Sequence, residues 1–209
     1  MTTRRHFLQL LAILPVITAL GCRDDTTFKI IPKGSKVCAL GDSLTFGYGA
    51  KKGEDYPSRL AALTGWQIEN AGVSGDTTAN VLARLEGVLA SSPKLVLLGV
   101  GGNDVLRRVP NDETYQNLLA IVNRLKNASI DTILIAEPHL SMGALFGSLS
   151  DNPVYQKVAD ETKVPLLADA WSKILSDDSL KSDQIHANAQ GYAKFADTLY
   201  EFLKQLGYV

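Results

Sequence analysis

The sequence predicts an α/β domain, a three-layer α/β/α sandwich with a five-stranded parallel sheet between two layers of helices. Strand-like and helix-like segments alternate from residue 36 onward, an order that is typical of a parallel sheet with helices on both faces. Residues 95–100 form an uninterrupted apolar run, as expected for a strand that is buried on both faces. Two irregular stretches, 41–55 and 137–151, follow predicted strands, at the edge where such sheets place their ligands.

Each predicted strand is a short run of apolar or β-branched residues. The first run ends at Gly41, and the second alternates between apolar and polar side chains. The fourth is rich in β-branched residues, which favour strands. In chain order, the predicted strands are residues 37–40, 66–71, 95–100, 132–136 and 165–168.

The predicted helices carry their apolar residues on one face. Residues 77–90 and 112–127 each contain five apolar side chains at the spacing that forms a single helical stripe. Pro57 lies in the first turn of the first helix, and Ser91-Ser92-Pro93 ends the second. In chain order, the predicted helices are residues 56–63, 77–90, 112–127, 152–163 and 188–206.

The first 21 residues have the pattern of a secretion signal. Arg4-Arg5 precedes an apolar stretch, residues 7–20, that is too short to span a bilayer comfortably as a helix. The residues around this arginine pair resemble the twin-arginine export motif, and Ala19-Leu20-Gly21-Cys22 resembles a bacterial lipobox. We expect residues 1–21 to be removed, Cys22 to be lipidated, 22–35 to form a tether and 36–209 one domain. An ordinary signal peptide cut nearby and an uncleaved anchor are the alternatives.

Composition excludes several classes of function. The chain has 209 residues and a formal net charge of −1, without a basic stripe or charge block that could follow a nucleic-acid backbone. Its two cysteines and three histidines form no cluster with metal-ligand spacing, so we expect no metal and no cofactor. Cys38 lies within an apolar strand and is expected to be a small buried hydrophobe.

Ser43 is the candidate nucleophile. It follows a predicted strand in Gly41-Asp42-Ser43-Leu44, where the glycine permits a sharp turn. A serine hydroxyl needs a base to take its proton and a carboxylate to orient that base, and Asp183-Gln184-Ile185-His186 supplies both. His139 is a competing base, but no carboxylate stands at the matching spacing. Taken singly, the serine motif is also compatible with an ordinary turn and His186 with a hydrogen-bonded core histidine.

The order of four motifs resembles the SGNH (GDSL-type) hydrolase family. Two more motifs lie between the serine and the histidine: Asn70-Ala71-Gly72-Val73-Ser74-Gly75-Asp76 and Gly101-Gly102-Asn103-Asp104. The resemblance extends over residues 36–206 and is strongest to the bacterial thioesterase, lysophospholipase and arylesterase branch. A Gly-x-Ser-x-Gly elbow is absent from the sequence, which excludes the usual α/β-hydrolase site.

This resemblance implies the flavodoxin-like SGNH fold and a role for each motif. Ser43, Asp183 and His186 are the implied catalytic residues, and the implied oxyanion donors are the N–H groups of Ser43 and Gly75 and the side-chain amide of Asn103. Asp42, Asp76 and Asp104 are better explained by caps and loop hydrogen bonds. Ala187 stands where the family usually has proline, which removes a rigid turn element but no catalytic group.

We therefore expect a serine hydrolase that cleaves esters or thioesters of small molecules, acts as a monomer and needs no nucleic acid. A carbohydrate O-acetylesterase or O-acetyltransferase of the cell envelope is one alternative, and a non-catalytic envelope binding protein is another. The protein is expected to be exported, periplasmic and lipid-anchored to the membrane. Because Arg23, and not aspartate, follows Cys22, the outer membrane is favoured in a Gram-negative host.

The segment 140–149 is the candidate acyl-binding region. It follows a predicted strand and is too apolar for a loop that faces only water. The alternative is that these residues simply cover the core. The side chains expected to contact the acyl group are Met142, Leu145, Phe146 and Leu149.

Overall fold

Five parallel strands form one sheet in the order β2-β1-β3-β4-β5, which confirms the predicted fold class. The structure, a computed structural model, describes residues 30–139 and 149–209. After β1 the chain adds β2 on one side and β3 on the other, so the sheet has a switch point between β1 and β3. Ligands of open α/β sheets bind beyond the carboxyl ends of the strands at such a point. The strands are β1 (Lys36–Gly41), β2 (Gln67–Gly72), β3 (Leu95–Gly99), β4 (Asp131–Ile135) and β5 (Leu166–Leu167).

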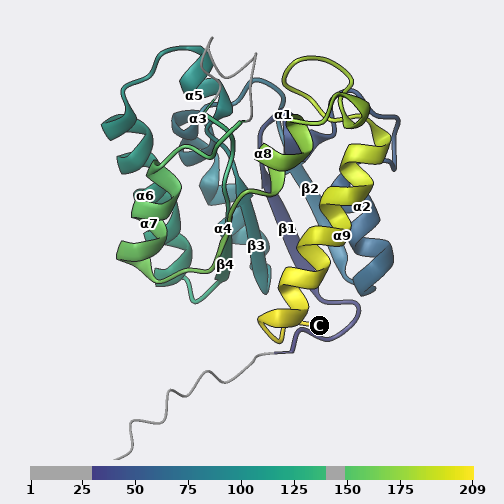
Figure 1. Cartoon of the computed structure of the whole chain (residues 1–209). Helices are drawn as coiled ribbons and strands as arrows, with labels where there is room; N and C mark the ends of the chain where they lie inside the picture. The colour runs from purple at the N-terminus through teal and green to yellow at the C-terminus, as the bar shows by residue number, and fades with distance from the viewer. Residues whose placement is uncertain (1–29, 140–148) are drawn as a thin grey trace, which may run out of the picture.

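Helices cover both faces of the sheet (Figure 1). The side chains of each strand alternate between two buried clusters: Val37 and Ala39 pack on one face, Cys38 and Leu40 on the other. On the first face lie α2 (Tyr56–Thr64), α8 (Ala170–Leu175) and α9 (Ala189–Gln205). On the second lie α3 (Thr78–Ala83), α4 (Leu85–Ser91), α6 (Asn111–Asn127) and α7 (Val154–Thr162).

A row of glycines crosses the carboxyl edge of the sheet. Gly41 pairs in register with Gly72 of β2 and with Gly99 of β3. A Cβ atom on Gly41 would lie 2.1 Å from the carbonyl oxygen of Gly99 and 2.2 Å from the hydroxyl of Thr45. Only glycine therefore fits at this end of β1, from which the chain turns directly into the candidate nucleophile.

The prediction of one continuous helix over residues 77–90 was wrong. The structure has two helices, α3 and α4, separated at Arg84, which takes non-helical dihedrals (φ −102°, ψ 8°). The Arg84 guanidinium donates to Asp76 Oδ2 at 2.8 Å and to the carbonyls of Gly41 and Ala71 at 2.9 Å each. The helix is thus interrupted at the residue whose side chain holds the ends of β1 and β2.

Three short helices were not predicted from the sequence. They are α1 (Ser43–Phe46), α5 (Gly102–Leu106) and α8, with four, five and six residues. Segments this short contain too few turns to show a hydrophobic period, and α1 falls within a stretch predicted to be irregular. A 3-10 turn at Asp178–Leu180 precedes the histidine motif. Among the described helices, none has both the length and the apolar character needed to cross a bilayer.

Candidate active site

Ser43 is the first residue of α1, directly beyond β1. The carboxylate of Asp42 caps this helix by accepting a hydrogen bond from the Leu44 N–H at 3.0 Å. Gly47 ends it in the left-handed conformation (φ +92°). The short helix, fixed at both ends, presents the Ser43 hydroxyl at the carboxyl edge of the sheet, with 8% of the residue exposed.

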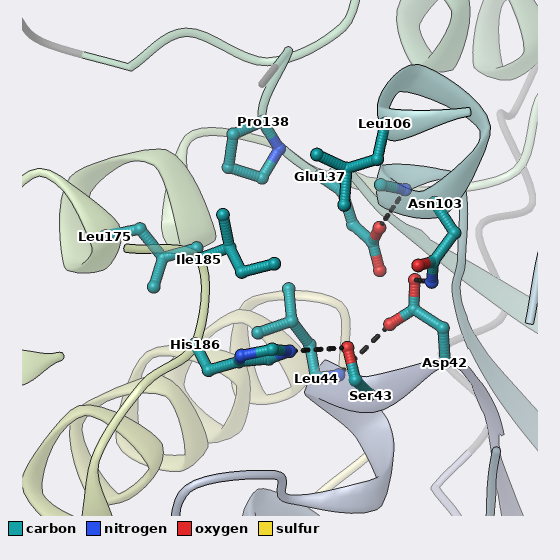
Figure 2. Close-up of a pocket in the computed structure, with 11 residues that line it drawn as sticks. Asp42, Ser43, Leu44, Asn103, Leu106, Glu137, Pro138, Leu175, Ile185 and His186 are labelled. Atoms are coloured by element: carbon teal, nitrogen blue, oxygen red, sulfur yellow. Dashed lines mark hydrogen bonds between the residues drawn. The ribbon is translucent and has the colours of Figure 1, made fainter. Parts of the chain in front are cut away.

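His186 and Asp183 complete a chain of hydrogen bonds to Ser43. His186 Nε2 lies 3.0 Å from Ser43 Oγ, and His186 Nδ1 lies 2.8 Å from Asp183 Oδ2 (Figure 2 shows the first of these contacts). Asp183 Oδ1 also accepts the backbone N–H groups of Ile185 and His186, so the carboxylate organises its own loop. Burial by itself raises the pKa of the Asp183 carboxyl, but the hydrogen bonds from His186 and Ile185 outweigh it and lower that pKa overall. The structure therefore brings together all three residues of the predicted triad.

Tyr48 packs against the imidazole of His186, a contact that the sequence motifs do not indicate. The two ring centroids are 4.4 Å apart and the rings are tilted by 40°. The Tyr48 N–H donates to the Ser43 carbonyl at 3.0 Å, and the Tyr192 hydroxyl of α9 donates to the Tyr48 carbonyl at 2.8 Å. Tyr48 thus connects the serine turn, the histidine and the C-terminal helix.

A small hollow, with room for about 20 Å³, opens beside Ser43 and His186. Its walls differ in chemistry, as Figure 2 shows: polar groups gather around Asn103, with Leu106 beside them, and Pro138, Ile185 and Leu175 lie opposite. The polar wall consists of Asp42, Asn103 and Glu137, and the apolar residues are Leu44, Leu106, Pro138, Leu175 and Ile185. An ester placed here would have its carbonyl near the polar wall and carbon atoms along the apolar one.

The two further candidate oxyanion donors are placed differently. Asn103 lines the hollow, and its amide nitrogen donates to Asp42 Oδ2 at 3.3 Å and to the Asp76 carbonyl at 3.0 Å. Both amide hydrogens therefore have acceptors in this structure, and the longer bond must be exchanged for one to a substrate oxygen. Gly75 has a positive φ of +89° and its carbonyl accepts from Arg107, but it is not among the described residues that line the hollow.

Two carboxyl groups of the polar wall are almost fully buried. Asp42 is 2% exposed and Glu137 is 1% exposed. Burial raises the pKa of Asp42 to about 7, and burial together with the charge of Asp42 raises the pKa of Glu137 well above its ordinary value. The sequence motifs indicate no role for Glu137, because burial of a carboxyl group depends on the tertiary structure.

The remaining predicted residues lie away from the hollow or outside the described residues. Cys22, Met142, Leu145 and Phe146 fall within residues 1–29 and 140–148, which the structure does not describe. Leu149 is partly buried against the core cluster that contains Trp171, and its N–H donates to Ser176 Oγ at 3.0 Å. His139 is not among the described residues that line the hollow, and the base that contacts Ser43 is His186.

Comparison with known proteins agrees with this geometry. The chain matches the GDSL-like Lipase/Acylhydrolase family over residues 39–194, a range that includes the serine turn and the histidine loop. It is 32% identical over 176 residues to thioesterase 1/protease 1/lysophospholipase L1 of Escherichia coli (strain K12), which covers 80% of this chain and 82% of that protein. It is also 32% identical over 141 residues to an arylesterase of Vibrio mimicus, with 63% and 69% covered. Psychrotrophic esterase EstA from Pseudoalteromonas sp., in a crystal structure inhibited by monoethylphosphonate, superposes with a TM-score of 0.69 at 26% identity, over 82% of this chain and 97% of that one.

Proposed function

The chain belongs to the GDSL-like lipase/acylhydrolase family, and on that premise we propose that it hydrolyses carboxylic esters or thioesters through an acyl-enzyme on Ser43. The observation that carries this proposal is the unbroken series of contacts from Asp183 through His186 to the Ser43 hydroxyl. A carboxylate on Nδ1 fixes the tautomer in which Nε2 is free to accept the serine proton. The names of the Escherichia coli and Vibrio mimicus relatives are consistent with ester and thioester chemistry.

Acylation begins when Ser43 Oγ attacks the carbonyl carbon of the ester and His186 Nε2 takes the hydroxyl proton. The carbonyl oxygen becomes an oxyanion, which needs hydrogen-bond donors at the place where the charge forms. The Asn103 amide supplies one donor by exchanging its bond to Asp42, and we propose the N–H groups of Ser43 and Gly75 as the others. The bond to the leaving oxygen or sulfur then breaks, and His186 returns the proton to that alcohol or thiol.

Deacylation repeats these steps with water as the nucleophile. His186 takes a proton from the water, whose oxygen attacks the acyl carbon and forms a second oxyanion in the same place. The bond from Ser43 Oγ to the acyl carbon breaks, Ser43 regains its proton from His186, and the carboxylic acid leaves. The reaction consumes one water for each ester and requires no group beyond these side chains.

Labelling by a fluorophosphonate probe tests the nucleophile directly. The wild type should be labelled and should hydrolyse p-nitrophenyl esters, whereas Ser43→Ala should lose both activities and keep its melting temperature. Ser58→Ala is a matched control, because Ser58 is a serine near the start of α2 whose hydroxyl donates to Asp55 and does not line the hollow. Turnover by Ser43→Ala above about one per cent of wild type would contradict the assignment, since removal of a nucleophile costs several orders of magnitude.

The acyl specificity is a finer proposal. We propose medium-length acyl chains, because the hollow has an apolar wall that includes Pro138, and the segment 140–149, which follows in the sequence, is rich in apolar residues. Each added methylene should strengthen binding of the transition state by up to about 0.8 kcal/mol, and so raise kcat/KM, until the binding groove is full. Phe146→Ala should flatten this dependence and spare acetate esters. If acetate esters are the best substrates and acetylated xylan or peptidoglycan is cleaved faster than any longer ester, a carbohydrate O-acetylesterase is the better description.

We also propose that the protein is a monomer, that it is exported, and that a lipid on Cys22 anchors it in the membrane. This proposal is supported by the paired arginines, the apolar stretch and the lipobox-like residues at the start of the sequence. A lipid at Cys22 would leave residues 23–30 as a tether. The expected tether is shorter than residues 22–35, because Ile31 is buried in the core and its N–H donates to the Tyr208 carbonyl at 2.9 Å.

A further inference from the structure

The buried carboxyl groups of Asp42 and Glu137 lie side by side beneath the oxyanion site. Glu137 Oε2 accepts the Gly102 N–H at 2.6 Å. Glu137 Oε1 is buried and receives no hydrogen bond from any donor among the described residues. Its neighbour is the Asp42 carboxyl, which lies close enough for a hydrogen bond if one of the two groups carries a proton. This placement leaves room for a single proton between two acceptors.

The charges around Glu137 favour such a proton. The titratable groups around Glu137 are all acidic. They are the carboxyls of Asp42 and Asp104 and the phenols of Tyr56 and Tyr155. Asp104 already receives hydrogen bonds from the N–H and hydroxyl of Thr78 and from the hydroxyl of Thr114, which stabilise its negative charge. Two neighbouring carboxylates that are both buried and both ionised would be strongly unfavourable.

Both carboxyl groups also hold the start of α5, the helix that carries Asn103. Glu137 holds the Gly102 N–H, and Asp42 accepts from the Asn103 amide. Gly101 takes a φ of +141°, and a Cβ atom there would lie 2.4 Å from the Tyr155 hydroxyl, which donates to the Val100 carbonyl. The turn before α5 is therefore held by Glu137 and packed against Tyr155; Figure 2 shows the Glu137 carboxyl next to the start of this helix.

We propose that Glu137 is a positioning residue for the oxyanion site: its protonated carboxyl donates to Asp42 and accepts from Gly102, and so fixes the start of α5, which aims the Asn103 amide at the substrate carbonyl. The proposal rests on the ester hydrolysis proposed above. The shared proton limits the pair to one negative charge, and this matters because a second charge so close would oppose the forming oxyanion. Glu137 itself touches neither the nucleophile nor the base in this arrangement.

Two substitutions at one position test this role. Glu137→Gln keeps the pattern, since its amide oxygen can accept from Gly102 and its NH₂ can donate to Asp42. We expect its kcat to stay within about threefold of wild type. Glu137→Leu removes both contacts, and we expect kcat to fall by about tenfold to a hundredfold with KM within about twofold, because misplacement of an oxyanion donor acts on the transition state.

A control variant separates positioning from simple loss of stability. Val88→Ala removes buried side-chain volume from α4, which leads into the start of β3, away from the hollow. Its melting temperature should fall while its kcat stays at the wild-type value. If Val88→Ala and Glu137→Leu lower kcat alike at the same fraction folded, the loss comes from general destabilisation and the positioning role is refuted.

The melting temperature as a function of pH tests the proton without any substrate. Folding raises the pKa of Glu137, so the folded protein binds a proton that the unfolded chain releases. The contribution of this group to wild-type stability therefore falls as the pH rises above about 4. Glu137→Gln cannot lose that proton. The melting temperature of Glu137→Gln minus that of wild type should therefore grow as the pH rises above about 5, by roughly 3–5 °C per pH unit, until Glu137 ionises in the folded wild type.

The two readouts fail independently. A constant difference in melting temperature across this pH range would show that Glu137 is ionised and would overturn the shared proton. Equal kcat values for Glu137→Leu and wild type would overturn the positioning role. The wild type could also hydrolyse no ester while the difference in melting temperature grows with pH. That result would support the shared proton and would refute both the proposed function and the positioning role.

Discussion

Replacement of Asn103 by alanine should slow turnover much more than it weakens substrate binding. Asn103 lines the hollow beside Ser43, and its side-chain amide is the proposed oxyanion donor there. In the ground state the ester carbonyl carries little charge, so the amide contributes little to KM. In the transition state the same oxygen is an anion, and the lost bond appears in kcat.

The expected loss in kcat follows from the value of an oxyanion donor and from the bond that the amide already makes to Asp42. Loss of one oxyanion donor costs about 2.7–4 kcal/mol in subtilisin, the reference case. In this protein the donor must first give up its 3.3 Å bond to Asp42, and a typical hydrogen bond has a net value of about 1 kcal/mol. The difference is about 1.7–3 kcal/mol, which corresponds to a loss of roughly 20- to 160-fold in kcat.

Steady-state hydrolysis of a p-nitrophenyl ester measures both constants. Asn117→Ala is a matched control, because that amide also makes a partly buried hydrogen bond, to Thr78 at 3.1 Å, but lies on α6 outside the hollow. It should keep the wild-type kcat. If Asn103→Ala retains kcat within about threefold, or shows its whole effect in KM, the amide binds substrate and does not stabilise the oxyanion.

Three further changes have defined outcomes. Asp183→Asn should lower kcat by about 10³–10⁴-fold, because the amide no longer fixes the His186 tautomer. Equal rates for this variant and the wild type would mean that another carboxylate orients the base. Tyr48→Ala should lower kcat by about two- to tenfold, since an aromatic contact contributes about 0.5–1.5 kcal/mol. Tyr48→Phe keeps the ring and should match wild type, and a loss of kcat in both variants would indicate a role for the hydroxyl. Cys22→Ala should release a soluble form of the protein or stop its processing, and Arg4-Arg5→Lys-Lys should block export. Wild-type protein that takes up no radioactive palmitate would contradict the lipid anchor.

The central strands β1, β3 and β4 could be predicted from the sequence because they are short apolar runs that are buried on both faces. The 95–100 run and the β-branched 132–136 run each correspond to a strand, with ends that differ by a single residue. The helix over 77–90 was predicted as one unit because its apolar spacing continues through Arg84. Its interruption coincides with bonds from Arg84 to Gly41 and Ala71, and such long-range contacts leave no mark on a local pattern.

The candidate site was predictable to a similar degree. Ser43 and His186 stand in motifs whose spacing indicates their chemistry, and the structure places them in contact. Tyr48 and Glu137 carry no such signal, because ring contact and burial depend on how distant segments pack. Leu149 shows the opposite limit: an apolar residue in a loop is compatible with both a substrate pocket and a core, and the structure places Leu149 against the core.

The distance along the chain between nucleophile and base bears on how the protein is made. Ser43 and His186 are 143 residues apart, and His186 lies just before α9, which packs against α2 and donates to the Tyr48 carbonyl. A growing chain that already contains the serine turn and most of the sheet therefore has no base beside its nucleophile. On the proposed mechanism, a chain that ends before the histidine loop lacks the contact to Ser43, and hydrolysis requires the complete C-terminal part of the domain.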